Sequence, residues 1–235
     1  IDQYSPNFES DYFNICCDET FDLRAYEKKG ENVEKLYVDF VKQIIDHLQE
    51  KGKKTMMWAD ILLEHPETID MLPDDVNFLN WDYSDSPNEE RIKKLSEMGR
   101  RQIVCPGTWS WSRLCETVEL EEDNISRMAE YGYKHGAFGV LNTNWGDWGN
   151  PCCLELASYG LVLGAEKSWS VKTEINDEFY SRVNFILFEN KTGIQLLKEL
   201  SYLHRFVSWD NFIANYFDHR YNSHKRPCNC MFTDL

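Results

Sequence analysis

The sequence is short of basic residues and contains no apolar run long enough to cross a membrane. Lys and Arg number 25 against 40 Asp and Glu, which gives a formal net charge of −15. This balance argues against binding to nucleic-acid phosphates or to an anionic membrane surface, because both need a positive field. We therefore expect neither a nucleic acid nor a membrane as a partner, and a neutral substrate fits the charge better.

Motifs for phosphate and metal binding are also missing. There is no Gly-rich phosphate loop, and the pair Cys228 and Cys230 has no second pair at zinc spacing. No His follows a predicted strand, which argues against a transition-metal site. The sequence therefore predicts no metal and no cofactor. Neighbouring Cys rarely bridge each other, and two pairs of the eight Cys are adjacent, so we expect reduced thiols and a cytoplasmic protein.

Aromatic residues, by contrast, are abundant. They make up 14% of the 235 residues and include eight Trp, which need either a large core or an aromatic-lined pocket. Hydrophobic residues at 42% and charged residues at 28% are typical of a folded globular chain. The first residues include no initiator Met and lead directly into a strand-like run. We expect the sequence to be part of a longer protein.

Short apolar runs alternate with amphipathic segments along the first two thirds of the chain. Continuous apolar runs predict buried strands, and apolar residues three and four positions apart predict helices. Such alternation indicates a parallel sheet covered by helices, as in a (β/α)8 barrel of the TIM type. An open flavodoxin-like sheet is the structural alternative. The predicted strands are 13–17, 55–59, 76–81, 102–106 and 138–143, and the predicted helices are 32–51, 64–71, 87–98 and 121–135.

The pattern changes near residue 166. Three consecutive helices are predicted at 174–189, 193–208 and 209–222, with no strand between them, and 223–235 resembles a tail. We therefore divide the chain into a barrel part, residues 1–165, and a helical part, residues 166–235.

Asp18 and Glu19 form a carboxylate pair at the end of the first predicted strand. Adjacent carboxylates repel each other and lose hydration near an apolar strand, which favours the protonated form that a general acid needs. Neighbouring strand residues point to opposite faces, so both can reach one site only if the strand has already opened into a loop. The alternative is a solvated strand end.

Aromatic and polar residues follow the other predicted strands. In a barrel the carboxyl ends of the strands build the active site. Indole rings there can stack on the apolar face of a sugar, while Asp and Asn bind its hydroxyls, although each Asp alone is more often a helix cap. We expect at least two of the Trp at strand ends to be packing residues, with Trp111 and Trp148 as the first candidates. The candidates are Trp58, Trp81, Tyr83, Trp109 and Trp145 for stacking, and Asp60, Asp82, Asp147 and Asn150 for hydroxyl binding.

At these positions the sequence resembles glycoside hydrolase family 20, the β-N-acetylhexosaminidases. Residues 13–23 (FNICCDETFDL) resemble the Asp-Glu signature of the family, closest to its intracellular-type branch. Four further segments resemble, in order, the family's fifth to eighth strands: 57–60, 81–83, 106–111 and 143–150. The resemblance covers about residues 8–165 and implies about strands 4–8 of the catalytic barrel, followed by C-terminal helices.

The resemblance also implies a mechanism in which the substrate's own 2-acetamido group is the nucleophile. By that resemblance Glu19 protonates the leaving oxygen and later activates water, Asp18 holds the acetamido N–H, and Tyr83 hydrogen-bonds the acetamido carbonyl. The substrate would be a glycoside ending in β-linked N-acetylhexosamine, cleaved by an exo-acting enzyme. The implied substrate-binding residues are Trp58, Asp60, Trp81, Trp109, Trp145 and Asp147.

Two features depart from the family pattern. Cys17 stands where the family usually has Gly, so its side chain could crowd the loop, and the first three strands, with the Arg that clamps sugar hydroxyls, are absent. We therefore expect this chain alone to be inactive, and either to self-associate or to pair with the missing N-terminal half. The alternatives are a non-catalytic carbohydrate-binding relative and a metal-dependent barrel enzyme that uses Asp18, Glu19 and Asp22, which the absence of His disfavours.

Overall fold

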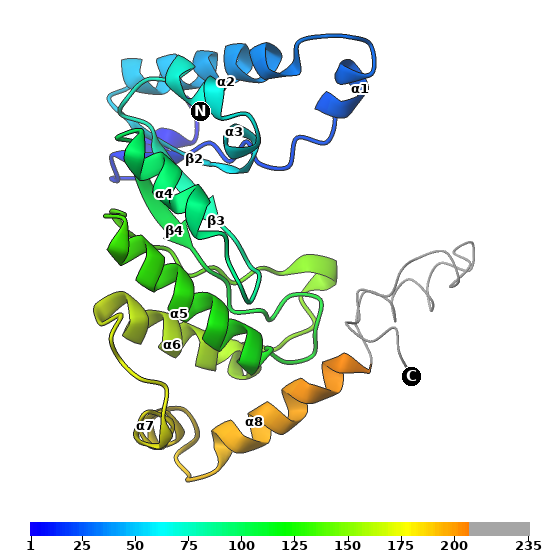
Figure 1. The fold of residues 1–235 in the computed structure, drawn as a ribbon, viewed down its shortest axis with the longest axis vertical. Coiled ribbons are helices and arrows are strands. Elements are labelled where there is room, and N and C mark those ends of the chain that lie inside the picture. Colours follow the sequence, from blue (N-terminus) through cyan, green and yellow to red (C-terminus); the bar gives the residue numbers. More distant parts are fainter. Residues whose placement is uncertain (207–235) are drawn as a thin grey trace, which may run out of the picture. The chain divides into compact units, whose positions relative to one another are not determined.

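The computed structural model describes residues 1–206, apart from the side chain of Trp148 (Figure 1). The chain forms two compact units that alternate along the sequence. The first unit contains residues 1–81, 88–105 and 131–140, and the second contains 82–87, 106–130 and the described residues from 141 onward. The predicted helix at 209–222, the tail at 223–235 and the pair Cys228 and Cys230 lie outside the described residues.

A five-stranded parallel sheet forms the centre of the first unit, and its strands lie side by side in sequence order. This confirms the predicted α/β architecture, while the closure of a barrel stays a prediction. The strands are β1 (Tyr12–Asn14), β2 (Lys54–Trp58), β3 (Asn77–Trp81), β4 (Arg101–Cys105) and β5 (Gly139–Val140). The first and last strands are shorter than predicted. Beyond β4 and β5, a single bridge between Gly107 and Thr143 continues the pairing inside the second unit.

Helices of the first unit begin and end at residues whose chemistry explains their bounds. The side chain of Asn32 accepts the N–H of Lys35 at the start of α2 (Val33–Glu50), and Gly52 follows the end of α2 with a φ of 71°. The buried face of α2 packs with β2, β3 and the segment after β2 in one apolar core. The other helices here are α1 (Leu23–Glu27), α3 (Asp60–Glu64), the 3-10 helix η2 (Pro66–Met71) and α4 (Glu89–Glu97), with η1 (Ser5–Asn7) near the start.

The second unit is mainly helical and has its own apolar core. It contains most of α5 (Val118–Lys134), followed by α6 (Ser158–Trp169), α7 (Asp177–Phe188) and α8 (Gly193–Tyr202). Short 3-10 turns lie between or after them: η3 (Asp147–Gly149), η4 (Leu154–Ala157) and η5 (Leu203–Arg205). The predicted helix at 174–189 is therefore confirmed, and the one predicted at 193–208 is confirmed as far as Tyr202, where α8 ends. Helix α5 begins three residues before the predicted start.

Helix α6 is the main element that the sequence pattern did not predict. It carries Gly160 and Gly164, which are poor helix formers and weaken the pattern. The structure explains both glycines, because a Cβ at Gly160 would collide with the carboxylate of Glu121, and a Cβ at Gly164 would collide with the side chain of Asn142. The domain division predicted after residue 165 falls inside α6 and stays a prediction.

In the described part of the chain, six cysteines are free of disulfides: Cys16, Cys17, Cys105, Cys115, Cys152 and Cys153. Within the same part, every helix is too short or too polar to serve as a membrane span.

Candidate active site

The pair Asp18 and Glu19 lies in an irregular loop after β1, which ends at Asn14. Cys16, Cys17 and Glu19 have φ angles of 60°, 68° and 47°. This left-handed region is unfavourable for residues with a Cβ, at roughly 1–2 kcal/mol each. The strand has therefore opened before the carboxylate pair, which is the condition for both side chains to reach one site, and Glu19 is the strained residue of the pair.

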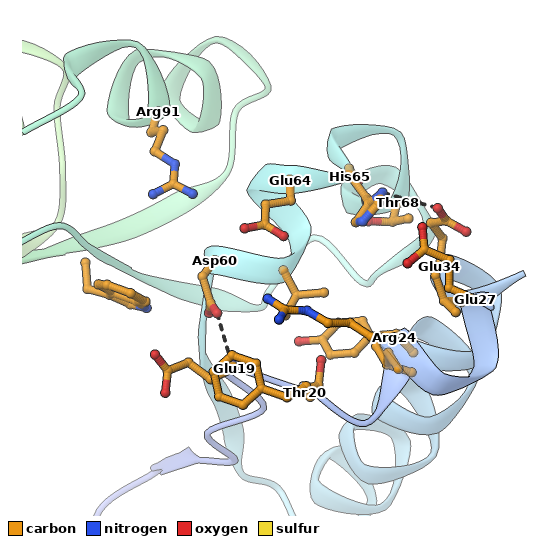
Figure 2. A pocket seen from close by; sticks show the side chains of 16 residues that line it. Glu19, Thr20, Arg24, Glu27, Glu34, Asp60, Glu64, His65, Thr68 and Arg91 are labelled. Atoms are coloured by element: carbon orange, nitrogen blue, oxygen red, sulfur yellow. Dashed lines mark hydrogen bonds and ion pairs between the residues drawn. The ribbon is translucent and has the colours of Figure 1, made fainter. Parts of the chain in front are cut away.

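Two buried side chains from other elements hold this loop. The hydroxyl of Tyr37, in α2, donates to the carbonyl oxygen of Cys17 at 2.7 Å. Oδ2 of Asp60, at the start of α3, accepts the backbone N–H of Glu19 at 3.0 Å (Figure 2). Tyr37 is 5% exposed and Asp60 is 8% exposed. The loop backbone is therefore fixed by the protein interior rather than by its own sequence.

Cys17 occupies its unusual position without the crowding that its side chain could cause. The Sγ atom lies 3.3 Å from the carbonyl oxygen of Ile15, and the side chain packs against the core of the first unit. Burial is the main factor that raises the pKa of Cys17, to about 11, so the thiol stays protonated near neutral pH. Cys17 is thus a packing residue in a backbone conformation that glycine would adopt at lower cost.

A cavity of about 460 Å³ lies beside the loop in the first unit (Figure 2). Glu19, Asp60 and Trp81 line it, so three predicted site residues share one cavity wall. Trp58 is only 6% exposed, and it is not among the lining residues. Sequence reasoning did not single out six acidic or basic side chains that also line the cavity: Arg24, Glu27, Glu34, Glu64, His65 and Arg91.

An aromatic cluster in the second unit brings together three other predicted residues. Nε1 of Trp145 donates to the hydroxyl oxygen of Tyr83 at 2.8 Å. Tyr83 meets Trp111 edge to face, with ring centroids 5.1 Å apart, and Trp111 stacks on Trp109 at 4.9 Å. Trp111 therefore packs between predicted site residues, as expected. A Cβ at Gly107 would lie 2.8 Å from the Trp111 ring and 3.0 Å from the Tyr83 ring, so this cluster requires glycine there.

Side-chain hydrogen bonds of Asn124 connect the segment around Tyr83 with the segment that begins at Gly107. Sequence reasoning missed this role. The side-chain N–H groups of Asn124 donate to the carbonyl oxygens of Asp82 and Ser84, both at 2.7 Å. Its Oδ1 accepts the N–H of Gly107 at 3.1 Å. Asn124 is completely buried in α5. In the sequence it is notable only as part of an Asn-x-Ser triplet, so its position gave no signal of this role.

The remaining candidates, Asp82, Asp147 and Asn150, also belong to the second unit. Oδ1 of Asp82 accepts from the N–H and the hydroxyl of Ser84, so part of this carboxylate stabilises a turn. Asp147 and Asn150 are exposed. Asp18, Glu19, Trp58, Asp60 and Trp81 belong to the first unit, whereas Tyr83, Trp109, Trp145 and Asp147 belong to the second. That both groups form one site stays a prediction.

A pair of buried carboxyl groups supports the helices of the second unit. The two oxygens of Glu116 accept the N–H groups of Tyr159 and Gly160 at 3.1 and 3.0 Å, at the start of α6. Burial raises the pKa of Glu116 from 4.5 to about 7, although these two N–H groups oppose the shift. Burial, together with the charge of Glu116, raises the pKa of Glu121 well above its usual range. Both side chains are fully buried, and burial favours the protonated form of each carboxyl group.

This pair predicts that the second unit loses stability as the pH rises. Because the folded-state pKa of Glu116 is raised, folding binds a proton between pH 4.5 and about 7. The stabilisation is complete below the unfolded pKa and is lost as the pH rises through the folded pKa, on the order of 3 kcal/mol in total. Urea denaturation followed by Trp fluorescence at pH 5 to 8 measures this loss. Glu121→Gln places a neutral side chain beside Glu116 and should reduce the pH dependence of the free energy of unfolding. An unchanged pH dependence in this variant would contradict the contribution of the Glu116 and Glu121 pair.

Comparison with known proteins shows which family model the sequence matches. The sequence model described as "Glycosyl hydrolase family 20, catalytic domain" matches residues 3–182. No curated protein sequence is significantly similar to the chain.

Two solved structures have a similar fold. A β-N-acetylhexosaminidase from Bacteroides fragilis matches 81% of the chain with a TM-score of 0.58 and 21% identity. An inactive mutant of an exo-β-N-acetylglucosaminidase from Vibrio harveyi matches 85% of the chain with a TM-score of 0.51 and 14% identity. The chain spans only 42% and 34% of the lengths of these two proteins. At these identities the likeness concerns the fold.

Proposed function

Because the chain belongs to glycoside hydrolase family 20, we propose that the full-length protein is an exo-acting β-N-acetylhexosaminidase. The observation that carries this proposal is the loop of Asp18 and Glu19, whose strained backbone is held by buried side chains beside a cavity. Strain of this kind persists only where the surrounding structure enforces it, and it is concentrated at functional sites. The proposed substrate is a glycoside that ends in β-linked N-acetylhexosamine.

The proposed reaction uses the substrate's 2-acetamido group. Its carbonyl oxygen attacks the anomeric carbon while Glu19 gives a proton to the leaving glycosidic oxygen, and an oxazolinium ion forms. Glu19, now a carboxylate, then takes a proton from the water that opens this ion, so the proton balance is restored and the β configuration is retained. Asp18 would accept the acetamido N–H and stabilise its growing positive charge. The side chains proposed to bind the sugar are Trp58, Trp81, Trp109, Trp145 and Asp147. Asp60 was a candidate for hydroxyl binding from the sequence, but its Oδ2 accepts the N–H of Glu19.

Tyr83 would hydrogen-bond the acetamido carbonyl. In its contact with Trp145 the tyrosine oxygen is the acceptor, at 2.8 Å from the indole nitrogen. Gly107 and Asn124 support this arrangement, because one allows the close packing of the aromatic rings and the other fixes the backbone on either side of Tyr83.

We further propose that the five strands correspond to about strands 4–8 of a (β/α)8 barrel. Among the described strands, β1 and β5 each pair with a single neighbour, which leaves two sheet edges for further strands. The short coverage of both similar structures agrees with a chain that matches only part of a catalytic protein. We expect the 235-residue chain by itself to be inactive, and either to self-associate or to pair with the missing strands.

The proposal is tested with the full-length protein and two substrates that differ only at the 2-position. We expect cleavage of 4-nitrophenyl N-acetyl-β-glucosaminide, and turnover of 4-nitrophenyl β-glucoside that is at least about 1000-fold slower, because the second substrate lacks the internal nucleophile. Equal turnover of both would contradict substrate assistance. A protein that cleaves neither but binds N-acetylglucosamine would instead be a carbohydrate-binding relative.

A further inference from the structure

We propose that Tyr37 and Asp60 are positioning residues, which hold the backbone around Asp18 so that Glu19 points its proton at the leaving oxygen. This inference rests on the proposed function and assigns two side chains to its acid step. Neither side chain needs to touch the reacting atoms for this role.

The two contacts are placed on either side of Asp18. The carbonyl oxygen of Cys17 belongs to the peptide group before Asp18, and the hydroxyl of Tyr37 donates to it at 2.7 Å. The N–H of Glu19 belongs to the peptide group after Asp18, and Oδ2 of Asp60 accepts it at 3.0 Å. Both peptide planes that flank Asp18 are therefore held by a side chain. The orientation of Asp18 and the starting direction of the Glu19 side chain depend on these planes.

Without such contacts this backbone would relax. Cys17 and Glu19 both have left-handed φ angles, which residues with a Cβ avoid. Tyr37 lies near the start of the long helix α2 and is 5% exposed, so its ring cannot follow a moving loop. Loss of either contact would let the loop move toward ordinary backbone angles. A displacement of about 1 Å at a catalytic group can lower the rate by about 100-fold.

The burial of Asp60 supports its role as an acceptor for the backbone N–H of Glu19. Asp60 is 8% exposed, and its other oxygen, Oδ1, is buried and has no hydrogen-bond partner in the described part of the chain. A buried carboxylate is costly unless its interactions compensate, and an N–H bond to a carboxylate is stronger than one to a neutral acceptor. The geometry of this bond needs only an acceptor oxygen at the Oδ2 position. Asparagine can supply such an oxygen, whereas alanine cannot.

The hydroxyl of Tyr37 is tested by a leaving-group comparison in the full-length protein. Departure of 2,4-dinitrophenolate needs little help from an acid, whereas departure of 4-methoxyphenolate needs a proton from Glu19. kcat/KM reports only the steps up to leaving-group departure, so the later use of Glu19 as a base does not affect it. For Tyr37→Phe we expect kcat/KM to fall about 10-fold or more on the methoxyphenyl N-acetyl-β-glucosaminide, and to change by less than about 3-fold on the dinitrophenyl substrate.

Tyr159→Phe is the matched control. Tyr159 is also a buried tyrosine, and its hydroxyl donates to Glu122 at 2.5 Å within the second unit. This variant should lose similar stability and leave both kcat/KM values unchanged. An equal fall on both substrates for Tyr37→Phe would assign the loss to Asp18 rather than to the acid step of Glu19, and would overturn the inference. No fall on either substrate would overturn it as well. A wild-type protein that cleaves neither substrate would instead refute the proposed function.

Asp60 is tested by comparing Asp60→Asn with Asp60→Ala. We expect Asp60→Ala to lower kcat about 100-fold on the methoxyphenyl substrate with KM nearly unchanged, and Asp60→Asn to recover most of this loss because its amide oxygen can accept the Glu19 N–H. A raised KM with unchanged kcat would mean that Asp60 binds a sugar hydroxyl instead. If Asp60→Ala does not fold, Asp60→Asn and Tyr37→Phe still test the inference. Both replacements nearly conserve side-chain volume, so these variants should fold.

Discussion

Replacing Glu19 with Gln in the full-length protein should lower kcat/KM on 4-methoxyphenyl N-acetyl-β-glucosaminide by about 1000-fold or more. General acid catalysis contributes about 10²–10⁴-fold, and the amide of Gln has nearly the shape of the carboxyl group but cannot release a proton. The side chain of Glu19 is exposed. Its replacement should therefore change the free energy of unfolding by less than about 0.5 kcal/mol.

The measurement combines steady-state kinetics with thermal unfolding of the same preparations. Glu31→Gln is the matched control, because Glu31 is an exposed carboxylate of the first unit that lies outside the cavity lining. It should leave both kinetics and stability unchanged. Unchanged turnover in Glu19→Gln would remove Glu19 from the mechanism, and a large loss of stability in that variant would mean that Glu19 has a structural role.

The second large effect is expected at Asn124. Asn124→Ala removes three hydrogen bonds and leaves two carbonyl oxygens and one N–H group without their partner. The N–H group belongs to the buried Gly107, whereas the carbonyl oxygens belong to the half-buried Asp82 and the exposed Ser84. Each such group costs about 1–3 kcal/mol where it is buried, so we expect a loss of about 3–5 kcal/mol in the free energy of unfolding. Urea denaturation followed by Trp fluorescence measures this loss. Activity should fall as well, because the backbone around Tyr83 is no longer fixed.

Asn190→Ala is the control for this variant. Asn190 is the Asn of the chain's other Asn-x-Ser/Thr triplet, and its exposed side chain accepts the N–H groups of Thr192 and Gly193 at the start of α8. Loss of this local cap should cost only about 1 kcal/mol. A similar, small loss at Asn124 would contradict its role as a link between segments. Because Asn124 is fully buried, the folded chain could not carry a glycan there.

The local sequence pattern was sufficient for most elements of the first unit. Continuous apolar runs identified all five strands, and the apolar periodicity of residues 32–51 identified α2 almost to its ends. The carboxylate pair was recognised because it follows a buried strand, and because the motif around it resembles a family signature. Such signals are available in the sequence because periodicity and turn residues depend on neighbours a few positions away. Helix α6 was missed because its glycines serve contacts with distant segments.

By itself, then, the sequence determined the five strands, most of the helices, the place of Asp18 and Glu19 after the first strand, and the family. Only the tertiary structure decided what holds that pair. Tyr37 lies 20 residues from its partner Cys17, and Asp60 lies 41 residues from its partner Glu19. Likewise, Asn124 bonds backbone groups 17 to 42 residues away. A polar residue's own neighbours do not reveal its partner, because burial and the fold, rather than local spacing, bring donor and acceptor together.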